Sequence, residues 1–288
     1  MKLTAQAPAK INRELRVGRI RPDGFHEVFS RMTSISLADT LTVEDADGLE
    51  LACDDAAVPA GRDNIVIRAA ESLAQRAGVP ARARIHLEKR VPMGGGLGGG
   101  SADAAIALRL LARLWRTGED PTELAAIAAS LGSDVPFFLT GGEADVRGRG
   151  EVVTPAEDSD STKLLLLVPP FSISTAGVYG KHAGRFDLPE RLEISDPGHE
   201  KFLGPNDLAS AVLLMEPRME AYVESAARIT PDHLISGSGA TIVLHAPPPG
   251  AAETLAGWHP RARLYPCRTL TRLEFQDATS PSPRGGLP

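Results

Sequence analysis

The stretch PMGGGLGGGSADAA, residues 92–105, contains six glycines among its fourteen residues. Glycine loses more conformational freedom on folding than other residues, which destabilises regular structure by about 0.5–1 kcal/mol relative to alanine. A cluster this dense indicates that the backbone turns tightly here or that another molecule approaches it closely. The stretch follows a strand predicted over residues 82–91, where apolar and polar residues alternate, and leads into an alanine- and leucine-rich helix predicted over residues 101–116.

A glycine loop that joins a strand to a helix is typical of a phosphate site. Its backbone N–H groups can surround phosphate oxygens, and the helix N-terminus adds about half a positive charge. Ser101, at the predicted N-cap, offers a hydroxyl to a phosphate or to Mg²⁺. The sequence therefore predicts that this loop binds the phosphates of a ligand.

The Walker A and dinucleotide-binding patterns match this loop less well. No lysine follows Gly100, which excludes a Walker A loop. Gly94, Gly96 and Gly99 match the dinucleotide pattern, but a run this rich in glycine matches it almost automatically. The acidic residues about twenty positions on lie at a helix start, whereas the dinucleotide fold places one at a strand end. A flexible loop without a ligand is disfavoured by the apolar helix directly after it.

The composition is that of a globular protein from a reducing compartment. The 288 residues suffice for two domains, and the 42% hydrophobic and 24% charged residues are ordinary values. A formal net charge of −6 disfavours nucleic acid as a partner. Cys53 and Cys267 form neither a metal pair nor a disulfide framework. No signal-like run starts the sequence and no apolar window of about 18 residues occurs, so we expect a cytoplasmic protein without membrane contact.

The order of predicted elements indicates an α+β protein of two domains. The acidic, polar segment AEDSDSTK (156–163) predicts a linker, which divides the chain into residues 1–155 and 156–275. LLLLVPP (164–170) predicts a buried strand just after this linker. The end of the chain, residues 276–288, is rich in Ser, Pro and Gly and predicts a disordered tail.

Local signals fix the ends of several elements. Asp63 or Asn64 caps the helix that follows it. Residues 120–123 form a capping box with proline at the first helical position, and they open a further helix. Pro136 disfavours helical angles in the residue before it, so residues 132–139 are predicted to be extended.

The glycine stretch resembles the nucleotide motif of the GHMP kinases. Its doubled glycines and its Asp-Ala-Ala ending are most similar to the branch of that superfamily whose substrate carries cytidine diphosphate. This resemblance implies a fold with an N-terminal domain like ribosomal S5 domain 2, a ferredoxin-like C-terminal domain and a site between them. Seven further segments agree in the same order: APAKIN (7–12), RPDGFHE (21–27), DNIVIRAA (63–70), GSDVPFF (132–138), FSISTAGVY (171–179), PNDL (205–208) and SGSGA (236–240).

The resemblance also implies a reaction and two catalytic residues. The branch uses ATP and Mg²⁺ to phosphorylate the 2-hydroxyl of 4-diphosphocytidyl-2-C-methylerythritol, a step of non-mevalonate isoprenoid precursor synthesis. Its G-x-D-V-P motif places the catalytic carboxylate at Asp134, and APAKIN places the second catalytic residue at Lys10. Asp134 accepts the hydroxyl proton or orients the hydroxyl, and Lys10 keeps Asp134 ionised. From their local sequence alone, Asp134 would be a turn residue and Lys10 a surface charge.

The nucleotide side of the implied site is built on the glycine stretch. Lys89 and Asn64 match further nucleotide positions, although Lys89 could equally be an exposed strand end. Ala102 departs from the family pattern, because many relatives carry a second serine there. The implied loop residues are Pro92, Gly94, Gly95, Gly96, Leu97, Gly98, Gly99, Gly100, Ser101 and Ala102.

The substrate side of the implied site must recognise a cytosine. Phe25 and His26 supply a ring face and a hydrogen-bonding edge, and Tyr179 either closes the other side of the base or is a core aromatic. Asn12 and Thr175 match positions that contact the sugar alcohol and the diphosphate. The second glycine turn, 236–239, either closes over the substrate or is only a tight turn. The histidines show no metal-site spacing, so no protein-built metal site is expected.

Rival functions conflict with particular residues. Mevalonate and homoserine carry no pyrimidine, so kinases of those substrates would not need the set Phe25, His26 and Tyr179. A ligand sensor without turnover would need neither Lys10 nor Asp134. An RNA-binding module, suggested by the S5-like half, conflicts with the net charge. Arg13 replaces a residue that is usually apolar in the family.

Overall fold

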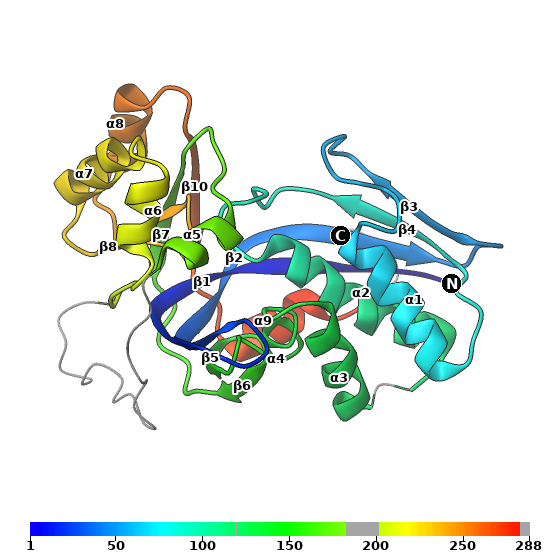
Figure 1. The fold of residues 1–288 in the computed structure, drawn as a ribbon. Coiled ribbons are helices and arrows are strands. Elements are labelled where there is room, and N and C mark those ends of the chain that lie inside the picture. The colour runs from blue at the N-terminus through cyan, green and yellow to red at the C-terminus, as the bar shows by residue number, and fades with distance from the viewer. Residues whose placement is uncertain (119, 183–201, 283–288) are drawn as a thin grey trace.

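The computed structural model describes residues 1–118, 120–182 and 202–282. Figure 1 shows two sheets with helices packed on them, which confirms the α+β class. Within the described residues, the first sheet has the order β3-β4-β2-β5-β6, with β1 paired to β2, and the second has the order β10-β7-β9-β8. The strands of the first sheet are β1 (Lys2–Ile20), β2 (His26–Glu44), β3 (Leu49–Cys53), β4 (Ala83–Glu88), β5 (Glu143–Arg147) and β6 (Val152–Pro155).

The long hairpin of β1 and β2 forms the central part of the first sheet. The two strands pair antiparallel from Lys2–Glu44 to Ile20–His26, and the predicted turn over 21–27 joins them. The pairing register shifts between Pro8 and Lys10. Proline has no N–H to donate to a ladder, so an irregularity is expected beside it. The shift lies directly before Lys10, the predicted catalytic lysine.

Three longer helices and one short helix follow the first hairpin. They are α1 (Ile65–Ala77), α2 (Gly99–Trp115), α3 (Pro121–Leu131) and α4 (Phe137–Thr140), and α1–α3 lie together on one face of the first sheet in Figure 1. Asn64 caps α1 by accepting a bond from the backbone N–H of Val66 at 2.8 Å. Asp120 caps α3 in the same way, but Glu123 accepts a bond from Arg76 instead of completing the predicted capping box, so only the Asp120 half of that prediction is confirmed.

Two local predictions near the site are wrong. Helix α2 begins at Gly99, so Gly98, in the left-handed region, is its N-cap and Ser101 lies inside the first turn. Residues 133–136 form a turn rather than a strand, and α4 starts directly after Pro136. Proline is well placed at a helix start because its missing N–H would have no helical partner there. That preference outweighs the restriction that proline imposes on the residue before it.

The second sheet carries its helices on one side. Its strands are antiparallel, and β7, which fills most of the predicted strand over 164–170, is buried after its first residue. Pro266 lies in the edge strand β10, where a missing donor is tolerated. The elements are β7 (Lys163–Val168), α5 (Thr175–Lys181), α6 (Ala209–Met215), α7 (Met219–Ile229), β8 (His233–Ile235), β9 (Ile242–His245), α8 (Ala251–Trp258) and β10 (Arg263–Arg268).

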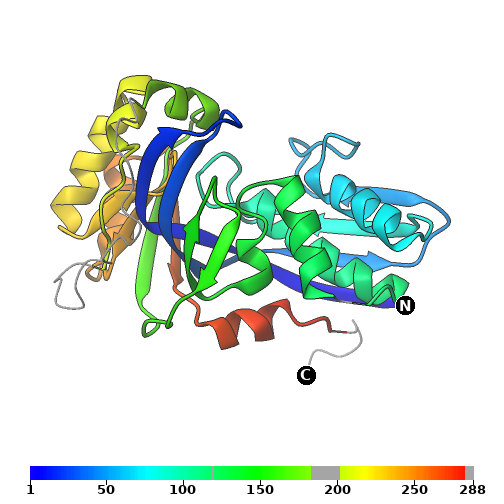
Figure 2. The same cartoon turned by 60° about the horizontal axis from the view of Figure 1, so that its bottom comes forward.

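The last helix returns to the first sheet. Helix α9 (Arg272–Thr279) starts with a Thr271–Glu274 capping box and lies along β1 in Figure 2. Its Phe275 is fully buried in the first core against Gly141, and Ser282 pairs with Thr4. The predicted disordered tail over 276–288 is therefore wrong for residues 276–282, while residues 283–288 lie outside the described part of the chain. The tail was predicted from its composition alone, which did not take into account the Thr271–Glu274 capping box just before it.

The hairpin of β1 and β2 belongs to both halves of the molecule. Leu3 and Ala5 lie in the core of the first sheet, whereas Leu15, Val17 and Val28 lie in the core under the second sheet. Residues 156–162 of the linker predicted over 156–163 connect β6 to β7, and Lys163 is already the first residue of β7. The hairpin tip, from the first part of the chain, packs under the second sheet, and α9, from the last part, packs on the first sheet. The division of the chain into two domains at residue 155 therefore stays a prediction.

Candidate active site

A cavity of about 1020 Å³ lies where the two halves meet. Its wall takes side chains from the middle and tip of the β1–β2 hairpin, from the glycine loop and from the second half of the chain. Asn64 and Ala102 are buried elsewhere: Asn64 serves as the cap of α1, and Ala102 belongs to the first core. The other predicted site residues line the cavity: Lys10, Asn12, Phe25, His26, Lys89, Pro92, Gly94, Gly95, Gly96, Leu97, Gly98, Gly99, Gly100, Ser101, Asp134, Thr175 and Tyr179.

Lys10 and Asp134 meet in this cavity although they are far apart in sequence. Lys10 Nζ lies 3.4 Å from Asp134 Oδ2, with 5% and 31% of the two side chains exposed. Lys10 Nζ also donates to Asn12 Oδ1 at 2.6 Å, and Asn12 Nδ2 donates to Ser30 Oγ at 2.7 Å. This chain of bonds fixes the ammonium, while the carboxylate keeps a face open to the cavity. A hydroxyl could therefore reach Asp134 beside a fixed positive charge.

The glycine loop is held close to Lys10 and to the second half of the chain. Leu97 O accepts a bond from the backbone N–H of Lys10 at 3.0 Å. Gly96 and Gly98 both have positive φ, which favours glycine. A Cβ at Gly96 would lie 2.3 Å from Ser236 O, and one at Gly98 would lie 2.8 Å from the Phe138 ring. Glycine is thus required at both positions for backbone angle and for space.

The turn over 236–239 packs against the glycine loop. Ser236 Oγ donates to Gly96 O at 3.2 Å, and the hydroxyls of Ser238 and Thr175 are 2.8 Å apart. Asn206 Nδ2 donates to both Ile235 O and Gly237 O at 2.7 Å, so it fixes the turn. The sequence interpretation gave Asn206 no role, although its PNDL segment was one of the matching motifs. The turn is more than a local feature, because it forms part of the cavity wall.

Lys89 is not an exposed strand end. Its side chain is 6% exposed and its ammonium forms ion pairs with Asp39 and, at 2.8 Å, with Asp103. Asp39 also accepts the backbone N–H groups of Arg90 and Val91, the residues that lead into the glycine loop. Burial alone would lower the pKa of Lys89, but the charges of Asp103 and Asp39 outweigh it and raise that pKa. The cluster therefore anchors the start of the loop.

The protonation of the buried Asp103 carboxyl makes stability depend on pH. Burial raises the pKa of Asp103 to about 8, and its Oδ1 has no hydrogen-bond partner in the described structure. Because the unfolded chain releases this proton at lower pH, the free energy of unfolding falls as the pH rises toward 8. We expect Asp103→Asn, which keeps an oxygen acceptor for Lys89, to flatten this fall. Thermal unfolding of both proteins at several pH values checks it; parallel Tm curves would contradict the expectation.

The predicted cytosine-binding residues lie at the tip of the hairpin and on α5. The rings of His26 and Tyr179 are 5.6 Å apart at 37°. His26 Nδ1 lies 3.0 Å from Gly18 O, which leaves Nε2 as the free acceptor when Nδ1 carries the proton. Tyr179 is part-buried and lines the cavity, and burial, followed by the charge of Asp134, raises the pKa of its phenol. Phe25 is 48% exposed.

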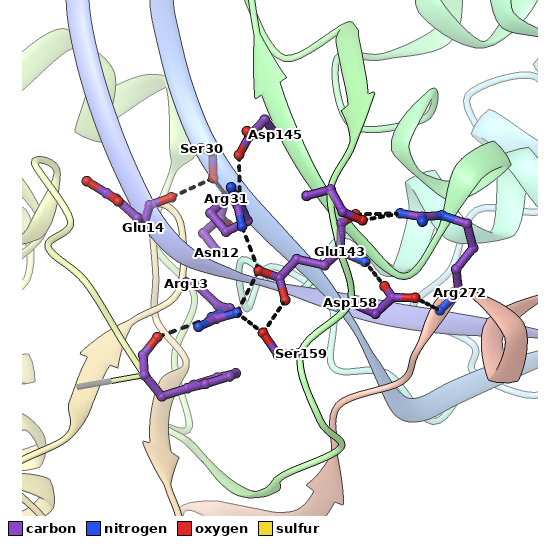
Figure 3. A network of polar contacts seen from close by, with 12 residues as sticks. Asn12, Arg13, Glu14, Ser30, Arg31, Glu143, Asp145, Asp158, Ser159 and Arg272 are labelled. Carbon is purple, nitrogen blue, oxygen red and sulfur yellow. Dashed lines mark hydrogen bonds and ion pairs between the residues drawn. The ribbon is translucent and has the colours of Figure 1, made fainter. Parts of the chain in front are cut away.

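Arg13, the departure from the family pattern, has its own buried partners. Figure 3 shows that Arg13 and Arg31 both point at Glu143, whose Oε1 accepts bonds from their Nη1 atoms at 2.6 and 2.9 Å. Arg31 Nε also donates to Asp145 at 2.6 Å. Burial lowers the pKa of Arg13, and the charge of Glu143 opposes that effect. Ser159 in the linker donates to the second Glu143 oxygen at 3.0 Å, so the linker is fixed in place here.

The comparisons with known proteins agree with this fold and cavity. The family model of the GHMP kinases N terminal domain matches residues 64–142, which contain the glycine loop and Asp134. A crystal structure of mevalonate kinase superposes with a TM-score of 0.69 and 11% identity, covering 94% of this chain and 99% of that chain, which shows the shared fold. The fold and family match together define a GHMP kinase.

Closer relatives identify one family within that class. The 4-diphosphocytidyl-2-C-methyl-D-erythritol kinase of Salinibacter ruber is 41% identical over 249 residues, covering 83% of this chain and 87% of the relative. That of Salinispora arenicola is 40% identical over 279 residues, covering 88% and 86%. A crystal structure titled 4-(cytidine 5'-diphospho)-2C-methyl-D-erythritol kinase matches with a TM-score of 0.77 and 33% identity, covering 92% and 98%. The chain belongs to the 4-diphosphocytidyl-2-C-methyl-D-erythritol kinase family.

Two further findings bear on the sequence predictions. In the described residues, no helix is both long and apolar enough to cross a membrane. The same residues contain no cluster of three or more His, Cys, Asp or Glu side chains that would hold a metal ion.

The cavity also contains Arg149, which the sequence interpretation did not select. Its place between two glycines, Gly148 and Gly150, marks a turn but indicates no function.

Proposed function

We propose that this chain uses ATP to phosphorylate the 2-hydroxyl of 4-diphosphocytidyl-2-C-methyl-D-erythritol. Its family supports the reaction, and the observation that carries the assignment of residues is the pairing of Lys10 with Asp134 in the cavity. The substrate hydroxyl binds at Asp134, which accepts its proton as the hydroxyl oxygen bonds to the γ-phosphorus of ATP. The bond from that phosphorus to the β–γ bridging oxygen breaks, and ADP leaves. Lys10 holds the Asp134 carboxylate in place and stabilises the negative charge that develops on the moving phosphoryl group.

The glycine loop holds the phosphates of ATP. The positive φ of Gly96 and Gly98 turns the loop tightly, and α2, a helix of 17 residues, begins directly after it. The first N–H groups of a helix have no partner within it, so those of α2 are available to phosphate oxygens. Lys89 acts on the nucleotide mainly through the loop, since two carboxylates already engage its ammonium.

Mg²⁺ fits this site as a companion of ATP. Magnesium prefers oxygen ligands, and in nucleotide sites it takes few from the protein and the rest from phosphates and water. The cavity offers the Ser101 hydroxyl, which would hold the ion together with the phosphates. Bound there, it would neutralise phosphate charge. Our proposal thus includes Mg·ATP without a protein-built metal centre.

The cytosine of the substrate binds between the hairpin tip and α5. His26 and Tyr179 present adjacent rings, and the free nitrogen of His26 accepts a bond from the exocyclic amine of the base. Thr175, paired with Ser238, contacts the substrate from the second half of the chain. Asn12 orients the sugar alcohol as well as Lys10. A cytoplasmic location and the absence of nucleic-acid and membrane partners stay predictions from composition.

Release of ADP by the purified chain with Mg·ATP tests the proposed function. The substrates offered are 4-diphosphocytidyl-2-C-methylerythritol, mevalonate and homoserine, each at the same concentration. We expect turnover with the cytidine compound alone. Turnover with mevalonate or homoserine would contradict the substrate assignment. A protein that binds ATP but phosphorylates none of the three would instead support a ligand sensor.

A further inference from the structure

The charges that line the cavity are unevenly compensated. Within the described wall, the lysine and arginine side chains are Lys10, Lys89 and Arg149. Lys10 pairs with Asp134, and Lys89 pairs with two carboxylates. In the described residues the guanidinium of Arg149 forms no ion pair. The bound substrates bring two diphosphate-containing anions into this cavity, so a cation there that forms no direct ion pair is suited to bind one of them.

Arg149 is held in place without losing its charge or its free donors. Its Nη2 donates to Ala129 O at 2.5 Å, and its guanidinium carbon lies 5.1 Å from the centroid of the Phe25 ring. These contacts fix the plane of the guanidinium. Within the described chain, Nε and Nη1 have no hydrogen-bond partner. Nη2 keeps a second hydrogen, which lies parallel to a hydrogen of either Nε or Nη1. One pair of parallel N–H donors therefore stays open on this plane and matches the oxygens of a phosphate.

The acids near Arg149 are engaged by other groups. Glu151 accepts the backbone N–H of Arg149 at 2.7 Å and lies 4.0 Å from Arg21. Asp23 accepts Arg21 Nε at 3.2 Å and the backbone N–H of Phe25 at 3.1 Å. The turn that carries Arg149 is fixed as well, because Gly148 donates to Glu27 at 3.1 Å and Gly150 packs on Ser133. A guanidinium held this firmly in the cavity wall is preorganised for a ligand.

We propose that Arg149 binds the diphosphate of the cytidine substrate. Its contact with Phe25 places it at the hairpin tip, next to His26, which is the end of the cavity assigned to the cytosine. The glycine loop supplies the phosphates of ATP with backbone donors at the start of α2, so the second diphosphate needs a partner of its own. This inference rests on the proposed function and adds a specificity-determining residue to it.

Calorimetric binding of four nucleotides to the full chain tests the role of Arg149. The probes are CDP, CMP, ADP and AMP, and the variants are Arg149→Gln, Arg149→Lys and Arg147→Gln. Arg147 is the matched control because it stacks on Phe29 and lies outside the cavity wall. We expect Arg149→Gln to weaken CDP about tenfold to a hundredfold, the range for a lost charged hydrogen bond, and to change CMP and ADP less than about threefold. Arg149→Lys keeps the charge but loses the pair of parallel N–H donors. Its affinity for CDP should therefore lie between those of the wild type and Arg149→Gln.

The selective loss of CDP separates binding from a structural role. A variant that is merely less well folded would lose all four nucleotides and show a lower Tm, which would overturn the proposal. An equal loss of CDP and CMP would also overturn it, because Arg149 would then act on the base. Selective loss of ADP would assign the residue to ATP. If the wild-type chain binds no cytidine nucleotide, the proposed function fails too; if it binds CDP and Arg149→Gln binds it equally well, only this inference fails.

Discussion

Replacing Asp134 by Asn is expected to lower the turnover number by about a hundredfold to ten-thousandfold, the range that general base catalysis contributes. The amide keeps the size of the side chain but can neither accept the hydroxyl proton nor attract Lys10 as an anion. Asp134 is 31% exposed and forms its ion pair at 3.4 Å, so the fold depends little on it. We therefore expect an unchanged Tm and unchanged ADP binding.

Steady-state kinetics with 4-diphosphocytidyl-2-C-methylerythritol measures this effect. Asp63→Asn is the matched control, because Asp63 is exposed and does not line the cavity. Lys10→Met should show a large loss as well, and the double variant should lose little more than the worse single one, because the two residues act as a unit. Turnover of Asp134→Asn near the wild-type value would show that Asp134 is not the base.

Glu143→Ala should give the largest loss of stability. The side chain is 3% exposed and its oxygens hold Arg13, Arg31 and Ser159, as Figure 3 shows. Removing it leaves two part-buried guanidinium groups without this counter-charge, and breaking a buried ion pair typically destabilises a protein by about 3–5 kcal/mol. Arg31 keeps Asp145, which places the expected value near the lower end of this range. Urea unfolding measures the free energy.

A surface pair provides the comparison for Glu143. Glu50 pairs with Arg84 at 3.2 Å, but 60% and 55% of these side chains are exposed. Exposed pairs contribute about 0–1 kcal/mol, so Glu50→Ala should change stability within that range. Replacing Arg13 and Glu143 together by Met and Leu should recover part of the loss, because no charge of that pair is then left unpaired. A loss below about 1 kcal/mol for Glu143→Ala would contradict a supporting role for the network.

The fold was predictable where the sequence pattern is periodic and local. The alternation through Ile85 and Leu87 identified β4, and Asn64 and the glycine after α1 marked the ends of that helix. The prediction failed where two local rules compete. Pro136 disfavours helix before it but starts one after it, and the helix that Thr271 caps continues into residues 276–279, the start of the segment predicted to be disordered.

The site was predictable mainly through resemblance. No periodicity relates Lys10 to Asp134, since a bulge in β1 and a turn before α4 bring them together. Arg149 and Asp39 could not be selected, because their importance depends on partners distant in the chain. The local signal for Asp39 was an Asp placed among the alternating apolar residues of β2, and its burial is visible only in the structure. The catalytic and binding roles of the predicted residues stay predictions until the variants are measured.

The shared hairpin also determines how the cavity can change shape. Ala9 and Ile11, on either side of Lys10, are fully buried in a third cluster that includes Leu97 of the glycine loop and Val243 of the second sheet. The two strands of the hairpin are thus fixed by packing at both ends and at their centre. The two chain crossings between the halves, at Thr162 and Thr269, are bonded to each other by a 3.0 Å N–H···O=C contact. A swing of one half against the other would have to bend these two strands at Lys10, so we expect access to the cavity to be governed by small elements at its rim.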